Sequence, residues 1–374
     1  MKSKKLGLFF TRNISLEVWR DKGLLDREKL IYEEHLKKGT LSEVTWFTYG
    51  HNDSEIAKEL KLEGRLHPSI NIVPMPKYFP ESKLGILIYS FLMSFINFER
   101  LSKLDFFKTN QMDGAWAAVI AKLLTQKPLA IRTGFTLSLF LLKKSRLNFS
   151  IISLVEKYIY QFSDLAYVSS EADKEYLTER YGLSMNHIKV LHNYIDTELF
   201  FDKGLERKDA YVFIGRLNAQ KNLFALLEAF KGSPHKLDLY GDGDQKKELE
   251  NTNNSENISF KGRISNDQVA EVLNSYKYYI LPSFYEGMPK TLLEGMASGC
   301  LALGTPVVGI NEVIRHNHNG LLAASTSAED IKALIKLSRT SDASSLIEAS
   351  KNTIDKEFSL KGISNLEAQL WATL

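Results

Sequence analysis

Residues 284–299 read FYEGMPKTLLEGMASG, and this stretch does more than any other to indicate the fold. An apolar, strand-like run, Tyr278–Leu281, stands just before it. Pro289 is expected in the first turn of a helix and Gly299 just past its end, because proline is tolerated at a helix start and glycine is favoured after the last turn. A buried strand, a short loop and a helix in this order predict one unit of a parallel α/β sheet.

The two glutamates of this stretch are separated by seven residues. Pro289 places Glu286 in the loop and Glu294 on the helix. The positive end of the helix dipole, with backbone N–H groups near Gly287, forms an anion site. Two carboxylates beside such a site suit the hydroxyl groups of a ligand rather than its phosphate. The alternative is a capped helix with a solvated glutamate at each end.

Three further clusters follow predicted strands: GRLNAQKN (215–222), YGDGDQ (240–245) and KGRIS (261–265). Ligands of open α/β sheets bind at the carboxyl ends of the strands, which is where these clusters are expected. Gly215 allows a sharp turn, and Arg216 and Lys221 beside a helix start are suited to binding an anion. Exposed cations and plain turns are the alternative interpretations.

The chain has 374 residues, which makes two domains the default expectation. Strand-like and helix-like segments alternate in both halves, which predicts parallel sheets covered by helices. We expect one domain at 1–200, a charged linker at 202–209, a second domain at 210–355 and a final helix at 356–374. The predicted strands are Leu6–Thr11, Glu43–Tyr49, Ile70–Pro74, Leu104–Lys108, Leu129–Arg132, Leu165–Ser169, Lys189–Leu191, Tyr211–Ile214, Leu237–Tyr240, Ile258–Lys261 and Tyr278–Leu281.

Composition and charge exclude some classes of binding partner and indicate the cellular compartment. The formal net charge of +3 is too small to indicate nucleic acid. Cys300 is the single cysteine and is expected to be a core residue. The N-terminal apolar run LGLFF is too short for a signal peptide, so we expect a cytoplasmic protein. The apolar run Leu84–Phe98 is shorter than the ~20 residues that span a bilayer, and it predicts a buried helix, with a membrane-facing helix as the alternative.

The motifs resemble those of a known family. EGMPKTLLE resembles the E-x7-E motif of retaining GT-B glycosyltransferases, especially family 4, and GRLNAQKN is similar to the Gly-Arg-Leu…Lys-Asn segment of that family. YGDGD resembles its Gly-x-Gly turn, NGLL (319–322) its closing motif, and LHNYIDTELF (191–200) its hinge segment. The resemblance covers residues 165–325, in the family's order. It implies a GT-B fold: two Rossmann-like, doubly wound α/β domains that face each other across a cleft, with the last helix crossing back to the first domain.

The resemblance also implies the roles of individual residues. Arg216 and Lys221 would hold the diphosphate of a nucleoside-diphosphate sugar, Glu286 would contact the sugar and Glu294 the ribose. The catalytic residues implied by the resemblance are Glu286, Arg216 and Lys221. The other residues expected around the donor are Gly215, Arg263, Ile264, Gly287, Met288, Lys290, Thr291 and Leu292.

The implied reaction is glycosyl transfer with retention of anomeric configuration, in surface polysaccharide or glycoconjugate synthesis. Two cations and a helix end would stabilise the departing nucleoside diphosphate, so we expect no cofactor and no essential metal. The sequence departs from the family in the loop TRNISLEVW (11–19), which lacks the glycines found after the first strand of many members. A sugar-nucleotide epimerase of the same fold, or a non-catalytic relative that only binds, are the alternative functions.

The acceptor is expected at the first domain. Asn110, Gln111 and Asp113 follow a predicted strand, and Arg132 follows the next; the alternative is an ordinary loop that caps a helix. Lysine and arginine outnumber acidic residues in 101–150, where the segment LFLLKK (139–144) also lies. This pattern suggests a saccharide or lipid-linked saccharide acceptor, with peripheral contact to an anionic membrane at its inner face as a hypothesis. A solvated basic face is the alternative.

Overall fold

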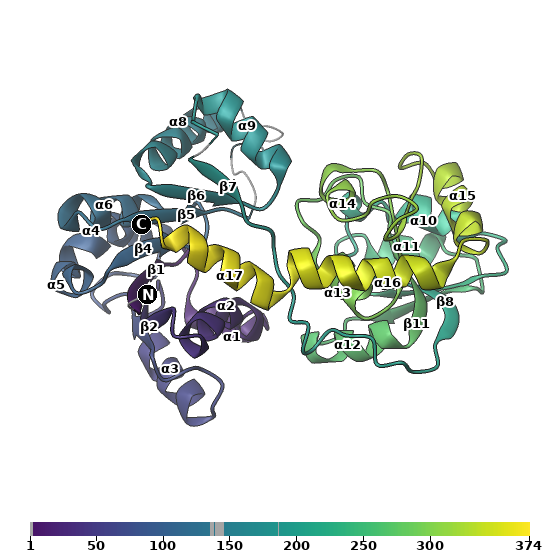
Figure 1. The fold of residues 1–374 in the computed structure, drawn as a ribbon, viewed down its shortest axis with the longest axis horizontal. Helices are drawn as coiled ribbons and strands as arrows, with labels where there is room; N and C mark the ends of the chain where they lie inside the picture. The colour runs from purple at the N-terminus through teal and green to yellow at the C-terminus, as the bar shows by residue number, and fades with distance from the viewer. Residues whose placement is uncertain (1–2, 135–137, 139–145, 186) are drawn as a thin grey trace. The chain divides into compact units, whose positions relative to one another are not determined.

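The computed structural model describes residues 3–134, 138, 146–185 and 187–374 (Figure 1). The chain divides into two compact units, Met1–Leu191 with Ser364–Leu374, and His192–Ile363. The segment LFLLKK (139–144) lies outside the described residues. No described helix is long and apolar enough to cross a bilayer.

The first unit contains a seven-stranded sheet in which every strand pair is parallel, with the order β3-β2-β1-β4-β5-β6-β7. The sequence order reverses between β1 and β4, the position where open α/β sheets bind ligands. The predicted strands of this half are confirmed to within about two residues. Their observed bounds are β1 Lys4–Phe9, β2 Leu41–Phe47, β3 Ile70–Val73, β4 Phe106–Thr109, β5 Leu129–Arg132, β6 Leu165–Val168 and β7 Ile188–Val190.

Helices connect these strands, as the alternating pattern predicted. They are α1 Leu16–Asp21, α2 Leu25–Lys37, α3 Asp53–Leu62, α4 Lys83–Ile96, α5 Phe98–Ser102, α6 Trp116–Thr125, α8 Arg146–Phe162 and α9 Glu171–Tyr181. The prediction of a buried helix over Leu84–Phe98 is wrong in part. The helix is present, but only Tyr89 and Met93 among its large apolar side chains are fully buried. The other inward positions are taken by Gly85, Ser90 and Ser94, and most of the remaining large apolar side chains are exposed.

The end of the last helix, α17 (Leu360–Trp371), is tied to the first unit by a buried ion pair. Lys108 Nζ on β4 lies 2.6 Å from Glu367 Oε1, and His35 Nε2 lies 3.0 Å from Glu367 Oε2. Burial opposes the charge of Glu367, but Lys108 and His35 outweigh it and hold its pKa at about 2. Counting Lys108 in a solvated basic face was therefore wrong: its side chain is buried and needs this carboxylate.

The second unit contains a six-stranded parallel sheet with the order β10-β9-β8-β11-β12-β13. The order reverses between β8 and β11. Four strands were predicted, at β8 Lys208–Ile214, β9 Lys236–Tyr240, β10 Ile258–Gly262 and β11 Tyr276–Leu281. Two more, β12 Leu301–Gly304 and β13 Leu321–Leu322, were not predicted.

Cap residues mark several helix starts in the second unit. The Ser265–Gln268 spacing predicts a capping box, and these residues form one at α12 Asn266–Asn274, while Ser327, a residue type favoured at helix starts, caps α15 Ala328–Ser338. Pro289 is the N-cap of α13 Lys290–Ala297, one residue before the first turn in which it was predicted. The remaining elements are η1 Ala219–Lys221, α10 Leu223–Phe230, α11 Lys246–Thr252, α14 Val308–Asn311, α16 Ala343–Thr353 and the π-helical turn η2 Ile354–Phe358.

The charged stretch Asp202–Asp209 is not a free linker, which corrects the sequence interpretation. The units divide earlier, between Leu191 and His192. Arg207 explains the difference, because its guanidinium donates to the backbone carbonyls of Leu273, Tyr276 and Ser298 and so fixes the stretch onto the second unit.

Candidate functional site

The loops that follow β8 and β11 meet through one carboxylate. Lys221 Nζ donates to Glu286 Oε1 at 2.5 Å, and the Ser283 hydroxyl donates to the same oxygen at 2.5 Å. Gln220 Nε2 donates to Glu286 Oε2 at 3.3 Å. The Glu286 side chain is only 7% exposed, so this carboxylate is held by three donors in a nearly dry position. The structure thus brings together two of the predicted residues, Lys221 and Glu286.

Backbone contacts fix these two loops against each other. The amide of Phe284 donates to the carbonyl of Gln220 at 2.9 Å, and Gln220 Nε2 donates to the carbonyl of Tyr285 at 2.9 Å. Gln220 therefore binds the second loop at three points, two of them through its side chain. The sequence analysis did not identify Gln220 or Ser283 as site residues. The signals that could have indicated them are that Gln220 adjoins Lys221 and that Ser283 lies three residues before Glu286.

The segment after β12, which contains Thr305 and Gly309, and Asn193 also contact the Glu286 loop. A Cβ at Gly309 would lie 1.6 Å from the carbonyl oxygen of Gly287, so only glycine fits there. The Thr305 hydroxyl donates to the carbonyl of Ser283 at 2.6 Å, and Asn193 Nδ2 donates to the carbonyl of Met288 at 3.3 Å. The backbone from 283 to 288 is thereby set before any ligand arrives.

The start of α13 lies directly after this loop. Lys290, Thr291 and Leu292 form its first turn, and Glu294 is on the helix while Glu286 is in the loop, as predicted. The Leu292 amide already donates to the Pro289 carbonyl at 3.1 Å, so a phosphate contact at Leu292 would have to replace that bond. Tyr279 donates its hydroxyl to Thr291 Oγ1 at 2.8 Å, which anchors the turn to β11.

The glycines of the β8 and β9 loops differ in what requires them. The chain bends at Gly215, directly after β8, as predicted, and it does so without a left-handed backbone conformation. A Cβ at Gly241 would lie 1.8 Å from the Gly215 carbonyl oxygen, and a Cβ at Gly243 would lie 2.1 Å from that of Leu217. The glycines of YGDGD are therefore required where the second loop passes against the first.

The loops after β8, β9 and β10 also share backbone hydrogen bonds. The Leu217 amide donates to the Asp242 carbonyl, the Gln245 amide to the Leu217 carbonyl, and the Gly241 amide to the Gly262 carbonyl, at 2.8–3.0 Å. Arg216 and Arg263 extend exposed side chains from this frame, while Ile264 is half-buried and packs against the core. The predicted donor-site residues lie in loops at the carboxyl edge of the sheet or on α13, where Glu294 is the fifth residue of the helix.

The acceptor residues proposed for the first unit are already engaged. Arg12 Nε donates to Asp113 Oδ1 at 3.1 Å, and the Arg12 amide donates to the Asp113 carbonyl. Gln111 Oε1 accepts from the Gly134 amide at 2.9 Å, and Asn110 is nearly buried. Arg12, which sequence reasoning did not consider, joins the β1 and β4 loops at the point where the strand order reverses.

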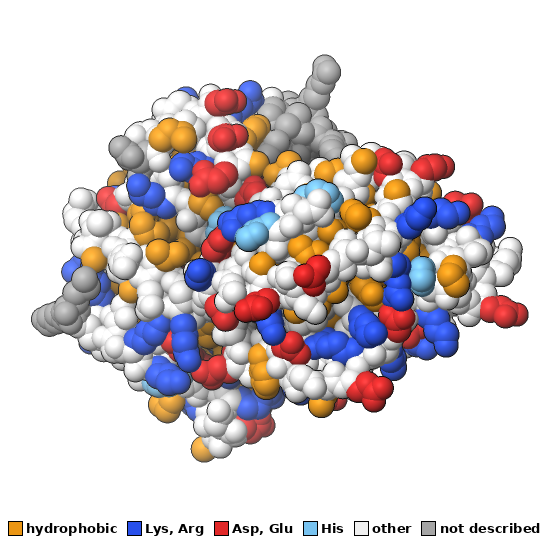
Figure 2. All heavy atoms as spheres, turned by 45° about the vertical axis from the view of Figure 1, so that its right-hand side comes forward, with side chains coloured by type: hydrophobic (Ala, Val, Ile, Leu, Met, Phe, Trp, Pro, Cys, Tyr) orange, Lys and Arg blue, Asp and Glu red, His pale blue; other side chains and the backbone are white. Residues whose placement is uncertain are grey.

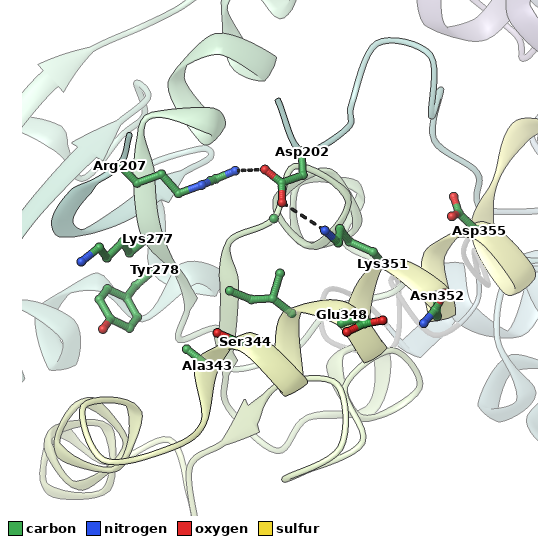
Figure 3. Close-up of a pocket in the computed structure, with 12 residues that line it drawn as sticks. Asp202, Arg207, Lys277, Tyr278, Ala343, Ser344, Glu348, Lys351, Asn352 and Asp355 are labelled. Atoms are coloured by element: carbon green, nitrogen blue, oxygen red, sulfur yellow. Dashed lines mark hydrogen bonds and ion pairs between the residues drawn. The ribbon is translucent and has the colours of Figure 1, made fainter. Parts of the chain in front are cut away.

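A separate cavity of about 710 Å³ lies at the opposite edge of the second sheet, where β8, β11 and β12 begin. Figure 3 shows two ion pairs in its wall: Asp202 lies between Arg207 and Lys351, at 2.7 Å and 3.1 Å. Burial opposes the charge of Asp202, yet hydrogen bonds from the Gly204 amide and Arg207 hold its pKa below its usual value. These ion pairs hold the segment 202–207, which precedes β8, against α16.

The described residues show neither a continuous charged surface on the face in Figure 2 nor a cluster of metal ligands. On the face drawn in Figure 2, positive and negative side chains are interspersed, and neither sign forms a continuous field. Among the residues that the structure describes, no group of three histidine, cysteine or acidic side chains is placed to hold a metal ion. Burial raises the pKa of Cys300 to about 12, and the residue lies in the core, as predicted.

Family models match both halves of the chain. The model described as Glycosyltransferase Family 4 matches residues 37–199, and the model described as Glycosyl transferases group 1 matches residues 196–353. The chain belongs to the family 4 type of GT-B glycosyltransferases. The fold and family predicted from its motifs are confirmed.

Two curated relatives of this family 4 protein illustrate the likeness. One is an uncharacterised glycosyltransferase of Methanocaldococcus jannaschii, 29% identical over 45% of the chain and 50% of the relative. The other, from Campylobacter jejuni, is 32% identical over 44% of the chain and 47% of the relative, and is named GalNAc-alpha-(1->4)-GalNAc-alpha-(1->3)-diNAcBac-PP-undecaprenol alpha-1,4-N-acetyl-D-galactosaminyltransferase. The matches span about half the length of these curated relatives.

Solved structures resemble the whole family 4 chain. Sucrose-phosphate synthase from Thermosynechococcus elongatus superposes with a TM-score of 0.76 at 17% identity, covering 99% of this chain and 98% of that one. The Anabaena protein HepE, in complex with UDP and glucose, gives a TM-score of 0.73 at 16% identity and covers 100% of both chains. At these identities the likeness shows the GT-B fold.

Proposed function

We propose that the protein transfers a sugar from a nucleoside-diphosphate sugar to a saccharide or lipid-linked saccharide, with retention of anomeric configuration. The observation that carries the proposal is the Lys221–Glu286 pair, held beside the start of α13 at the carboxyl edge of the second sheet. The HepE complex with UDP and glucose and the transferase names of the curated relatives support the donor class.

The chemistry that the pair would perform follows from its geometry. A lysine ammonium has three N–H donors, and one of them is used by Glu286. The remaining donors, with Arg216 and the α13 start, would stabilise the negative charge that gathers on the departing nucleoside diphosphate. Glu286 would keep Lys221 in place and accept a hydrogen bond from a sugar hydroxyl.

The other donor contacts follow the same arrangement. Glu294 would bind the ribose hydroxyls, and Arg263 and Ile264 would lie beside the base. The backbone near Gly287 and Met288, with Lys290 and Thr291, would meet the sugar and phosphates. With cations in these positions, no metal is required, and activity should persist in excess chelator; its loss there would indicate a metal-dependent enzyme.

The proposed acceptor rests on the names of relatives, whereas the proposed donor also rests on the geometry of the site. The name of the C. jejuni relative includes a PP-undecaprenol saccharide, which supports a lipid-linked acceptor and peripheral contact with an anionic membrane. A role in surface polysaccharide or glycoconjugate synthesis is consistent with the name of a second relative, the amylovoran biosynthesis glycosyltransferase of Erwinia amylovora.

The decisive experiment separates the proposal from its two alternatives. The protein is screened by thermal shift against UDP, GDP, ADP and CMP sugars, and a binding donor is then incubated with candidate acceptors. Release of nucleoside diphosphate with a new glycosidic bond of unchanged anomeric configuration supports a retaining transferase. Conversion of the donor into an epimeric nucleotide sugar, with no acceptor and no net release of nucleoside diphosphate, would indicate an epimerase. Binding without turnover would indicate a non-catalytic protein.

A further inference from the structure

Helix α4 of the first unit buries Tyr89 and Met93 but carries most of its large apolar side chains on the outside. Six of them recur at helical spacing along one stripe and are 41–65% exposed: Leu84, Ile88, Phe91, Leu92, Phe95 and Ile96. The stripe is about 18 Å long, given a rise of about 1.5 Å per residue. A surface helix of a globular protein normally shows the opposite pattern, with the apolar stripe facing the core.

The inward face of α4 fixes this orientation. Ser94 Oγ donates to the Ala117 carbonyl at 2.6 Å, and Trp116 Nε1 donates to Ser90 Oγ at 2.9 Å. A Cβ at Gly85 would lie 2.2 Å from the Pro80 carbonyl oxygen, so the backbone approaches closely there. Rotation of the helix to bury its stripe would break these contacts and bring large side chains into positions without room.

The exposed apolar surface continues beyond α4. Figure 1 shows α4, α5 and α6 grouped together, and α6 packs against both α4 and α8. Further half-exposed apolar side chains lie on these neighbours: Phe98 on α5, Leu123 on α6, and Ile151, Leu154, Val155, Tyr158 and Phe162 on α8. A large number of exposed apolar side chains on neighbouring helices marks an interaction site, whereas single exposed apolar residues do not.

The charges around the stripe indicate its partner. Helix α4 contains no acidic residue. Lys83 at its start and Arg100 beyond its end are exposed. The nearby carboxylates Glu81 and Glu99 lie 3.2 Å from His51 Nδ1 and 2.7 Å from Lys103 Nζ. An apolar surface with a cation at each end is complementary to acyl chains beneath anionic headgroups.

A second copy of the chain fits this surface less well. If two α4 helices packed antiparallel, Lys83 of each would face Arg100 of the other, and parallel packing would place identical cations together. Both arrangements bring these cations together, while the neighbouring carboxylates Glu81 and Glu99 already face His51 and Lys103, and this opposes association. Lipid phosphates provide the opposite charge in any orientation.

We propose that the α4 stripe, extended by α5, α6 and α8, is the surface on which the protein docks to an anionic membrane. This inference deepens the membrane contact of the proposed function and rests on that part of it alone. It needs no assumption about the donor, the acceptor or the reaction.

The test is co-sedimentation of the full chain with vesicles of phosphatidylcholine containing 30% phosphatidylglycerol at low salt. The double variant Leu92→Gln/Phe95→Gln should bind about tenfold more weakly, since each half-exposed side chain loses burial in the acyl region. The matched control Leu62→Gln/Leu366→Gln removes exposed leucines from α3 and α17 and should bind within about twofold of the wild type.

Charge is tested separately. Lys83→Gln/Arg100→Gln should weaken binding to the anionic vesicles by about 25-fold at low salt, at about fivefold per cation, and should not change binding to phosphatidylcholine alone. Melting temperatures of all variants should remain at the wild-type value, because the substituted side chains are exposed.

Three outcomes would overturn the inference. These are a wild type that does not bind anionic vesicles, a control variant that loses as much binding as the α4 variant, and a wild-type dimer that the α4 substitutions convert to monomers. The last outcome would assign the stripe to self-association. Nucleotide-induced thermal shifts are measured in parallel: their absence with intact vesicle binding would overturn the donor assignment and leave the docking surface standing.

Discussion

Lys221 Nζ and Glu286 Oε1 lie 2.5 Å apart, although the two residues follow different strands, β8 and β11, on either side of the point where the strand order reverses. The pair joins the cation proposed to hold a diphosphate to the carboxylate proposed to hold a sugar. A substitution of either residue therefore affects both the ligand contacts and the loop structure.

Lys221→Ala should lose at least about 100-fold in kcat/KM, because one of the donors to the leaving group is removed. It should also lower the free energy of unfolding by about 2 kcal/mol, since the nearly buried Glu286 carboxylate loses its counter-ion. Steady-state kinetics and urea denaturation measure the two effects. An unchanged kcat/KM would remove Lys221 from the catalytic group.

Arg216→Ala should lose about 100-fold in activity with an unchanged melting temperature, because its side chain is exposed and its proposed partner is the ligand. Lys231→Ala, another exposed cation of the same unit, is the matched control and should behave as the wild type. Equal activities in the two variants would contradict the assignment of Arg216.

Gly309→Ala should weaken donor binding by about tenfold or more, because the new methyl group displaces the Gly287 carbonyl and with it the Glu286 loop. The neighbouring Val308 is exposed, so Val308→Ala should have little effect. Calorimetric titration with the donor nucleotide distinguishes them. Normal binding by the glycine variant would show that the loop can move without loss.

The pH dependence of stability should include a contribution from Glu367. Its pKa of about 2 in the folded chain lies below the usual value near 4.5, so its stabilisation is present above pH 4.5 and is lost as the pH falls toward 2. Glu367→Gln should remove this contribution and leave Lys108 buried without its carboxylate, which lowers the free energy of unfolding at pH 7 by about 3–5 kcal/mol.

Denaturation from pH 7 to pH 3 measures this effect. The double variant Lys108→Met/Glu367→Gln should regain part of the stability, because neither side chain then buries a charge. A single Glu367→Gln variant as stable as the wild type would show that the carboxylate is not needed by Lys108.

The sequence predicted the strands with long apolar runs, the capped helices α12 and α15, and the loop and helix positions of Glu286 and Glu294. These features depend on local patterns, which a single sequence contains. It did not predict the roles of Gly241 and Gly309, because a glycine required by a distant carbonyl oxygen looks the same as one in a plain turn.

Burial was harder to predict than secondary structure. Lys108 appeared to belong to a basic face because its partner Glu367 is far away in sequence, and α4 appeared to be a core helix because its apolar residues outnumber the small and polar ones that face inward. In both cases burial depends on contacts with residues that are distant in sequence, and the local sequence does not reveal those contacts.

The hydrogen bonds that join the β8, β9 and β10 loops use main-chain atoms alone. Side chains at Arg216, Arg263 and Ile264 can therefore be exchanged while the architecture that presents them persists. Under the proposed donor site, substitutions at these three positions would change nucleotide preference while the loop backbone that carries them stays the same.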